Sequence, residues 1–169
     1  MTALPFLPPE TALVDTVRFT AARAETCLDD PACLPWLVTG AVLMAQQAAA
    51  IALRAVGDTI PEKSGATEIL LRAAHADRLP SPYTLPLPSH ARRCFDALVD
   101  ARNAHMHPRA GAWHVSPPTL ARGLPVATAA VRHLILMQPV VPDLVTPSAV
   151  GALSEDLSAI EALAEFLDE

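Results

Sequence analysis

The chain has 169 residues, of which 51% are hydrophobic and 4% aromatic, and its formal net charge is -6 at pH 7. This length predicts one domain with a core large enough to fold alone, and an alanine-rich chain with few aromatic residues favours helices over a β-sandwich. The acidic charge argues against a general attraction to nucleic acids or to anionic membranes.

The first part of the chain predicts three helices. Residues 1–9 form a proline-rich lead-in, after which apolar residues recur at helical spacing over 10–28. A second helix is expected over 35–56, and it is apolar nearly all round, so we expect it to be deeply buried. A turn-rich connection leads to a shorter helix over 66–77.

The second part of the chain predicts a loop and three more helices. Residues 78–90 hold four prolines and are expected to run as an extended surface loop. Ser89 is expected to cap the helix that follows over 91–105. The next helix is expected to start near residue 118 or 125 and to continue to residue 137, and residues 139–169 supply a linker and a C-terminal amphipathic helix over 147–167. The sequence therefore predicts a single all-α domain over residues 1–169.

Cysteine usage and the N-terminal residues predict a cytoplasmic protein. The three cysteines, Cys27, Cys33 and Cys94, form no CxxC pair, which is typical of reduced thiols. No basic residue opens the chain, so a secretory signal is not expected. Residues 31–53 carry no charge and are long enough to span a bilayer, but they contain proline, glycine and glutamine, and we expect a buried helix there.

Charge and histidine are unevenly distributed along the chain. Residues 88–133 contain six arginines against two aspartates, together with five of the six histidines. Residues 134–169 contain seven acidic residues and no basic ones. This pattern predicts a polarised surface or, alternatively, two separate solvated faces.

The segment "ARNAHMHP", residues 101–108, places polar side chains at the end of an apolar helix. Ala91, Phe95 and Leu98 follow helical spacing, and the next member of that stripe is Arg102. An unpaired arginine in a core is costly by several kcal/mol, so a carboxylate, a partner subunit or a phosphate is expected to meet it.

Asn103 and His107 lie four residues apart, so on a continuing helix they share one side, beside Arg102. A guanidinium binds a phosphate through two parallel hydrogen bonds, and an imidazole can move a proton near neutral pH. These groups suit attack of an RNA 2'-hydroxyl on the adjacent phosphorus, chemistry that requires no metal. Arg102, Asn103 and His107 are called the motif below.

The sequence "RNAHMH" resembles the RNxxxH form of the Rx4-6H motif of HEPN domains (higher eukaryotes and prokaryotes nucleotide-binding), with the motif residues at the matching positions. The stretch "FDALVDARNAHMHP" resembles the family's helix leading into the motif, and "WLVTGAVLMAQQAAAIALRAV" resembles its long apolar helix upstream. The resemblance covers roughly residues 10–138 in helix order. Gln46 and Gln47 stand where the family often has an acidic residue.

The resemblance implies an up-and-down bundle of four to five main helices that forms a homodimer, with the two motifs facing each other across a cleft. Active members cleave RNA without a metal or other cofactor, as toxins or defence effectors, and other members bind RNA, nucleotides or proteins. An antitoxin or regulatory protein is an expected partner.

In toxins neutralised by a nucleotidyltransferase-type antitoxin, a tyrosine often lies two residues after the motif histidine, and here that position is Arg109. Inactivation by adenylylation of that tyrosine is therefore not expected.

The leading hypothesis is a metal-independent endoribonuclease in which Arg102 stabilises the transition state, His107 transfers a proton and Asn103 orients the phosphate or the motif loop. Further contacts with RNA are expected from a second set of residues, namely His105, Arg109, Arg93 and His114. The alternatives are a non-catalytic HEPN module that binds RNA, a nucleotide or a protein, and a purely structural helical dimer.

Each motif residue also has a structural interpretation. Arg102 can form an ion pair with Asp96 or Asp100, Asn103 can serve as a C-terminal turn residue, and His107 can interact with the helix dipole.

The two nearby histidines suggest a metal site as a further alternative. His105, His107 and His114 could bind a metal ion, but two rings at i and i+2 of a helix diverge by about 200 degrees, so no metal site is expected. Trp113 is expected to be a packing residue that covers the end of the bundle.

Overall fold

The computed structural model describes residues 9–107 and 113–169, and the regular structure within them is entirely helical. The elements in chain order are α1 (Pro9–Thr26), η1 (Pro31–Cys33), α2 (Leu34–Ala55), α3 (Ala66–Ala73), α4 (Ala91–Met106), α5 (Pro117–Val131), η2 (Arg132–Met137) and α6 (Pro147–Asp168). Among the described residues, five helices have 15 residues or more, and α3 has eight. The predicted all-α bundle is confirmed.

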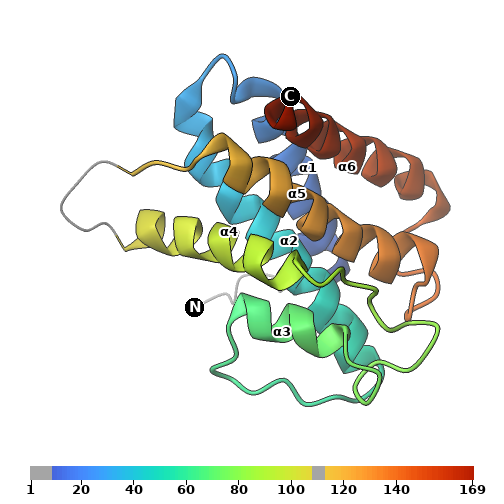
Figure 1. Cartoon of the computed structure of the whole chain (residues 1–169). Coiled ribbons are helices and arrows are strands. Elements are labelled where there is room, and N and C mark those ends of the chain that lie inside the picture. The colour runs from blue at the N-terminus through green and yellow to red at the C-terminus, as the bar shows by residue number, and fades with distance from the viewer. Residues whose placement is uncertain (1–8, 108–112) are drawn as a thin grey trace, which may run out of the picture.

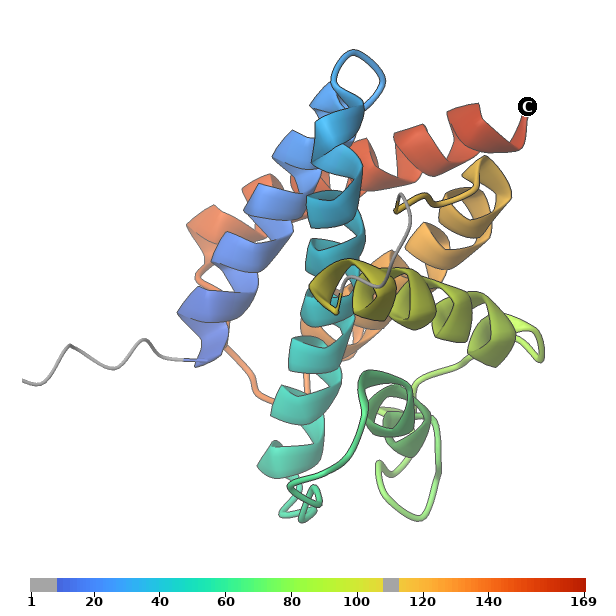
Figure 2. The same cartoon turned by 90° about the vertical axis from the view of Figure 1, so that its left-hand side faces the viewer.

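Helix α2 lies at the centre of the bundle and contacts α1, α3, α4 and α5. Helices α1 and α2 form an antiparallel hairpin, and α6 packs against α1 and α5 (Figure 1). Helix α4 crosses α2 and also packs against α5 (Figure 2). The C-terminal end of α4, which carries the motif, therefore lies against the central helix.

Helix α2 is mostly buried, as its apolar sequence predicts, but one side of it remains open. Eleven of its residues are buried, and the rest of the helix includes Trp36 and Leu43, which are 49% and 40% exposed. Gln46 and Gln47 are half-buried. The expectation of a helix buried nearly all round is corrected in this respect, because neighbouring helices do not cover this side.

Two stretches of the described chain are long and apolar enough to cross a membrane, Pro31–Ala55 and Pro117–Met137. In each of them, 61% of the most apolar 18 residues is buried inside the bundle. Core helices have the same length and composition, so these stretches are weak evidence for membrane spans.

The start of α4 differs from the prediction. The N-cap residue is His90 rather than Ser89, and the side chain of His90 makes no capping hydrogen bond. The backbone of His90 is already helical, with φ -87° and ψ -12°, and the N–H of Ala91 donates to the carbonyl of Pro88. The prediction of a Ser89 cap was therefore wrong, because a backbone turn begins the helix instead.

The loop before α4 is anchored in the core rather than extended over the surface. Helix α3 ends at Ala73, four residues before the predicted end, and turns follow it. Leu79 and Leu85 are buried, and the N–H of Leu85 donates to the carbonyl of Ala73 at 2.9 Å. Burial of the two leucines favours this inward path. The four prolines alone had indicated an extended surface loop, and that expectation is corrected.

Helix α5 starts at the earlier of the two predicted positions. The hydroxyl of Ser116 accepts a hydrogen bond from the N–H of Thr119, and prolines occupy the first turn, where no backbone donor is needed. Pro125 lies inside the helix, and the helical path continues through η2 to Met137.

Close packing of α5 on α4 depends on Gly123. A Cβ atom at this position would lie 2.7 Å from Cδ1 of Leu98, which is fully buried and has no room to move. We expect Gly123→Ala to lower the free energy of unfolding by about 1–2 kcal/mol, although alanine favours a helix by about 1 kcal/mol. Gly151→Ala on α6 is the matched control, because nothing lies within 4 Å, and it should stabilise by about 0.5–1 kcal/mol. Urea unfolding measures both, and equal stabilisation by the two substitutions would contradict the packing.

Helix α6 docks on η2 through an ion pair. Nε and Nη2 of Arg132 donate to the two carboxylate oxygens of Glu161, both at 2.8 Å, and Arg132 also bonds to Ser154 and Ser158. Burial raises the pKa of Glu161, but hydrogen bonds from Arg132 and Thr128 outweigh it and hold the pKa below its ordinary value. The ion pair therefore stabilises the fold at neutral pH and loses its effect as acid protonates Glu161.

The lowered pKa of Glu161 predicts that the contribution of this ion pair to the free energy of unfolding decreases in acid. The two side chains are 25% and 31% exposed, so solvent screens the pair and its contribution is about 1 kcal/mol or less. We expect Glu161→Gln to reduce the free energy of unfolding near pH 7, and the difference from wild type to shrink at about pH 3. Urea unfolding at both pH values checks this, and a difference independent of pH would contradict it.

Candidate functional site

The motif lies at the C-terminal end of α4, just beyond the hydrophobic core. Phe95 and Leu98 are fully buried on the apolar stripe of this helix, whereas Arg102 is half-buried. The expectation that Arg102 sits within the core is corrected, because the buried part of α4 ends one turn earlier. Its charge remains partly hydrated and does not need a buried carboxylate.

The guanidinium of Arg102 is held by its neighbour in sequence. Its Nε and Nη2 donate to Oδ1 of Asn103 at 3.2 and 2.8 Å. Among the described residues no carboxylate lies within 4.0 Å of it, and one of the two expected partners, Asp96, instead pairs with Arg92 at 3.7 Å. The ion pair expected from a structural role is thus not formed within the described part of the chain, and the remaining N–H donors of Arg102 can receive an anion.

His107 ends the helix with its side chain exposed. Its backbone N–H donates to the carbonyl of Asn103 at 2.9 Å, and its φ of -125° and ψ of 70° turn the chain away from the helix. Asn103 therefore contacts both other motif residues, Arg102 through its side chain and His107 through its carbonyl. The helix ends at Met106, so His107 is a cap residue and does not continue the helical side that Asn103 occupies.

Three aromatic rings lie in a row beside the motif, and we call Trp36, His105 and Trp113 the aromatic row. The ring centroids of Trp36 and His105 are 5.4 Å apart, and those of His105 and Trp113 are 5.8 Å apart, with edge-to-face geometry in both pairs. Nε1 of Trp113 donates to the carbonyl of Ala101 at 2.8 Å. Trp113 packs against the core, as the sequence predicts.

Sequence reasoning missed Trp36. This residue lies in the first turn of α2, more than 60 positions before the motif, and only the crossing of α2 by α4 brings it to His105. A tryptophan within an apolar helix is usually largely buried. Trp36 is 49% exposed, and its sequence position does not indicate this exposure.

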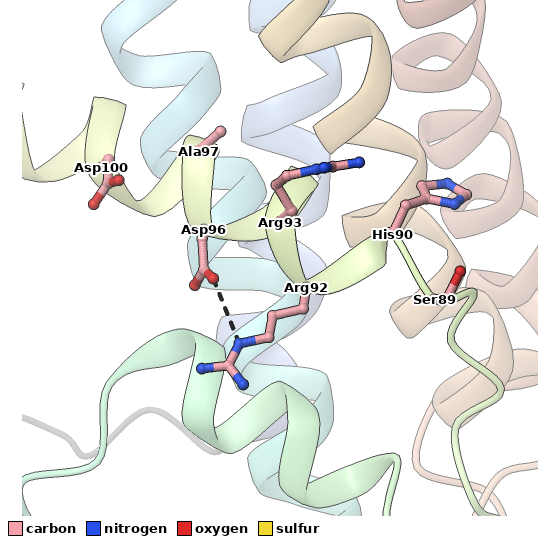
Figure 3. A pocket seen from close by; sticks show the side chains of 7 residues that line it. All are labelled: Ser89, His90, Arg92, Arg93, Asp96, Ala97 and Asp100. Atoms are coloured by element: carbon pink, nitrogen blue, oxygen red, sulfur yellow. Dashed lines mark ion pairs between the residues drawn. The ribbon is translucent and has the colours of Figure 1, made fainter.

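The other residues expected to contact RNA are dispersed. Arg93 lines a hollow of about 630 Å³ that follows α4 from Ser89 to Asp100 and excludes the motif. In Figure 3 the side chain of Arg93 reaches away from that of Arg92, which turns toward Asp96. The lining combines basic and acidic side chains, so its attraction for a phosphate is weak. His114 is exposed in the segment before α5, and Arg109 lies outside the described residues.

Potential metal ligands do not cluster within the described ranges. No group of three or more histidine, cysteine, aspartate or glutamate side chains is placed there to hold an ion. His105 is instead engaged with the two tryptophans of the aromatic row.

Comparison of the chain with models of known families, with curated proteins and with solved structures gives no match. The resemblance of the motif to that of HEPN domains therefore stays a prediction.

Proposed function

We propose that the chain is a metal-independent endoribonuclease of the HEPN type, acting in the cytoplasm as a toxin or defence effector. One observation carries the proposal: an arginine with no carboxylate partner among the described residues, held by Asn103, lies at the same helix end as an exposed histidine. A guanidinium with spare donors and an exposed imidazole five residues later are the two groups that RNA cleavage needs.

The chemistry follows from the groups present. The 2'-oxygen of a ribose attacks the adjacent phosphorus, and the bond from phosphorus to the 5'-oxygen of the next nucleotide breaks. His107 moves a proton, and the guanidinium of Arg102 stabilises the charge that develops on the phosphoryl oxygens. Asn103 orients the phosphate or the motif loop, and its side chain holds the guanidinium of Arg102. The products carry a 2',3'-cyclic phosphate and a 5'-hydroxyl.

A site shared between two copies supports both proton transfers. The 2'-hydroxyl must lose a proton and the 5'-oxygen must gain one, and a single exposed His107 can serve only one of these roles at a time. A homodimer with facing motifs supplies two histidines and two arginines. Sedimentation at micromolar concentration tests this part of the proposal, which predicts a dimer and which a monomer would contradict.

The second candidate is a non-catalytic module that binds RNA, a nucleotide or a protein partner such as an antitoxin or regulator. It is favoured by the engagement of Arg102 with Asn103 and by an imidazole of His107 that has no hydrogen-bond partner among the described residues. Such a module would bind through the same residues without cleaving.

Incubation with total RNA in the presence of a chelator separates the two candidates. We expect RNA decay with the wild type and none with Arg102→Ala/His107→Ala. Equal decay in both samples would assign the nuclease to a contaminant, and no decay in either would favour the binding module. Relief of expression toxicity by His107→Ala is expected of a toxin.

A further inference from the structure

We infer that Trp36 is a stacking platform for a nucleobase of single-stranded RNA, in the same site that binds the phosphate at Arg102. The inference rests on the proposed function for the identity of the ligand, and it assigns a binding role to a residue of α2 that the motif does not include. Three features of the structure support it: the open surface of the ring, the way the ring is held, and its attachment to the turn that carries Arg102.

The indole of Trp36 is open to solvent and has no polar partner among the described residues. Nearly half of the residue, 49%, is exposed. Among the described residues, two exposed phenylalanines differ from it: Phe19 lies under the guanidinium of Arg23, 5.1 Å from the ring centroid, and Phe166 lies near the end of α6. Within the part of the chain that the structure describes, Trp36 is thus a partly exposed ring whose neighbour, His105, lies three residues after Arg102 on α4. An exposed aromatic ring near a cationic residue suits the stacking of a base.

The aromatic row holds the indole in place before any ligand arrives. The rings of Trp36 and His105 meet at an interplanar angle of 80°, and those of His105 and Trp113 meet at 68°. The hydrogen bond from Trp113 to the carbonyl of Ala101 fixes the far end of the row. A ring that is already ordered loses little conformational freedom when a base stacks on it, so more of the stacking energy appears as affinity.

The row is anchored to the turn of α4 that carries the motif. Ala101, which binds Trp113, precedes Arg102 directly, and His105 lies three residues after Arg102 on the neighbouring helix surface. The inference therefore places the phosphate at Arg102 and the base on Trp36 within one bound strand. Because every base has an aromatic face, the platform accepts unpaired strands of many sequences and disfavours a duplex, whose bases are stacked on one another.

The test measures binding of a single-stranded DNA oligonucleotide of mixed sequence, which lacks the 2'-hydroxyl and so is not cleaved. Fluorescence anisotropy of a labelled oligonucleotide gives the affinity of the full-length wild type, Trp36→Ala, Trp36→Phe and the control Phe166→Ala. We expect Trp36→Ala to weaken binding about 5- to 150-fold, the range of one stacked base. Trp36→Phe should keep most of the affinity, and Phe166→Ala should match the wild type.

A second measurement does not depend on removing Trp36. The chain has two tryptophans, so Trp113→Phe leaves Trp36 as the sole indole fluorophore. We expect the oligonucleotide to quench this fluorescence with the same midpoint as the anisotropy change of this same variant, and a double-stranded form to quench it less.

The inference is overturned if Trp36→Ala binds the oligonucleotide as tightly as the wild type, or if saturating oligonucleotide leaves the fluorescence of Trp36 unchanged. The inference is also overturned if Trp36→Ala no longer forms a dimer but each chain still binds the oligonucleotide with the affinity of the wild type. That result would mean that the ring lies in the contact between two copies. Failure of the proposed cleavage looks different, because RNA would stay intact while the DNA oligonucleotide still bound and quenched Trp36.

Discussion

Arg102→Ala is expected to slow RNA cleavage about 10²- to 10³-fold while leaving the fold intact. The guanidinium is half-buried at the end of α4, outside the core, so its removal creates no cavity among packed side chains. What it removes is the positive charge that stabilises the phosphoryl oxygens during attack. Cleavage of a labelled RNA under single-turnover conditions measures the rate, and circular dichroism confirms that the helices are retained.

Arg92→Ala is the matched control for this substitution. Arg92 lies on the same helix, is largely exposed and pairs with Asp96 at 3.7 Å, away from the motif. We expect its cleavage rate to stay within about twofold of wild type, because surface ion pairs of this kind contribute little. If Arg102→Ala and Arg92→Ala cleaved equally well, Arg102 would have no part in the reaction.

Phe95→Ala is expected to destabilise the protein by about 3–5 kcal/mol, the largest loss among the substitutions considered. Phe95 is fully buried on α4 and belongs to the core shared with α2 and α5. Its ring fills space that the surrounding helices cannot close, so alanine leaves a cavity. Urea unfolding followed by circular dichroism measures the loss.

Phe166→Ala provides the comparison at an exposed position. Phe166 is 57% exposed on α6, and its replacement is expected to change the free energy of unfolding by no more than about 0.5 kcal/mol. A loss for Phe95→Ala below about 1 kcal/mol would mean that α4 is not fixed by this core. In that case the motif and the aromatic row would not be held in the positions described.

Helices with an unbroken apolar period could be predicted closely from the sequence. Helix α2 begins and ends one residue before its predicted bounds, and α6 begins at Pro147 as predicted and ends one residue later. The apolar spacing of α6 also identified its buried face, which includes Leu153, Leu157 and Ile160. In such segments burial of one face dominates the local preferences, so pattern alone is sufficient.

Features that depend on how helices cross could not be predicted. The spacing of Arg102 after Phe95 and Leu98 indicated a core position, but the core ends before that turn. Trp36 is exposed and adjacent to His105 only because α4 crosses α2 where it does. The hydrogen bonds from Arg102 to the side chain of Asn103 are local, but the sequence analysis did not predict them, because it expected a carboxylate, a partner subunit or a phosphate to meet this charge.

The central claim is that the motif cleaves RNA through its 2'-hydroxyl without a metal ion, and the chemical nature of the product ends tests this most directly. Purified protein is incubated with a single-stranded RNA in the presence of a chelator, and the fragments are analysed by mass spectrometry. We predict 2',3'-cyclic phosphate and 5'-hydroxyl ends with the wild type, and intact RNA with Arg102→Ala/His107→Ala. Fragments with 3'-hydroxyl and 5'-phosphate ends, or the same fragments from both proteins, would contradict it.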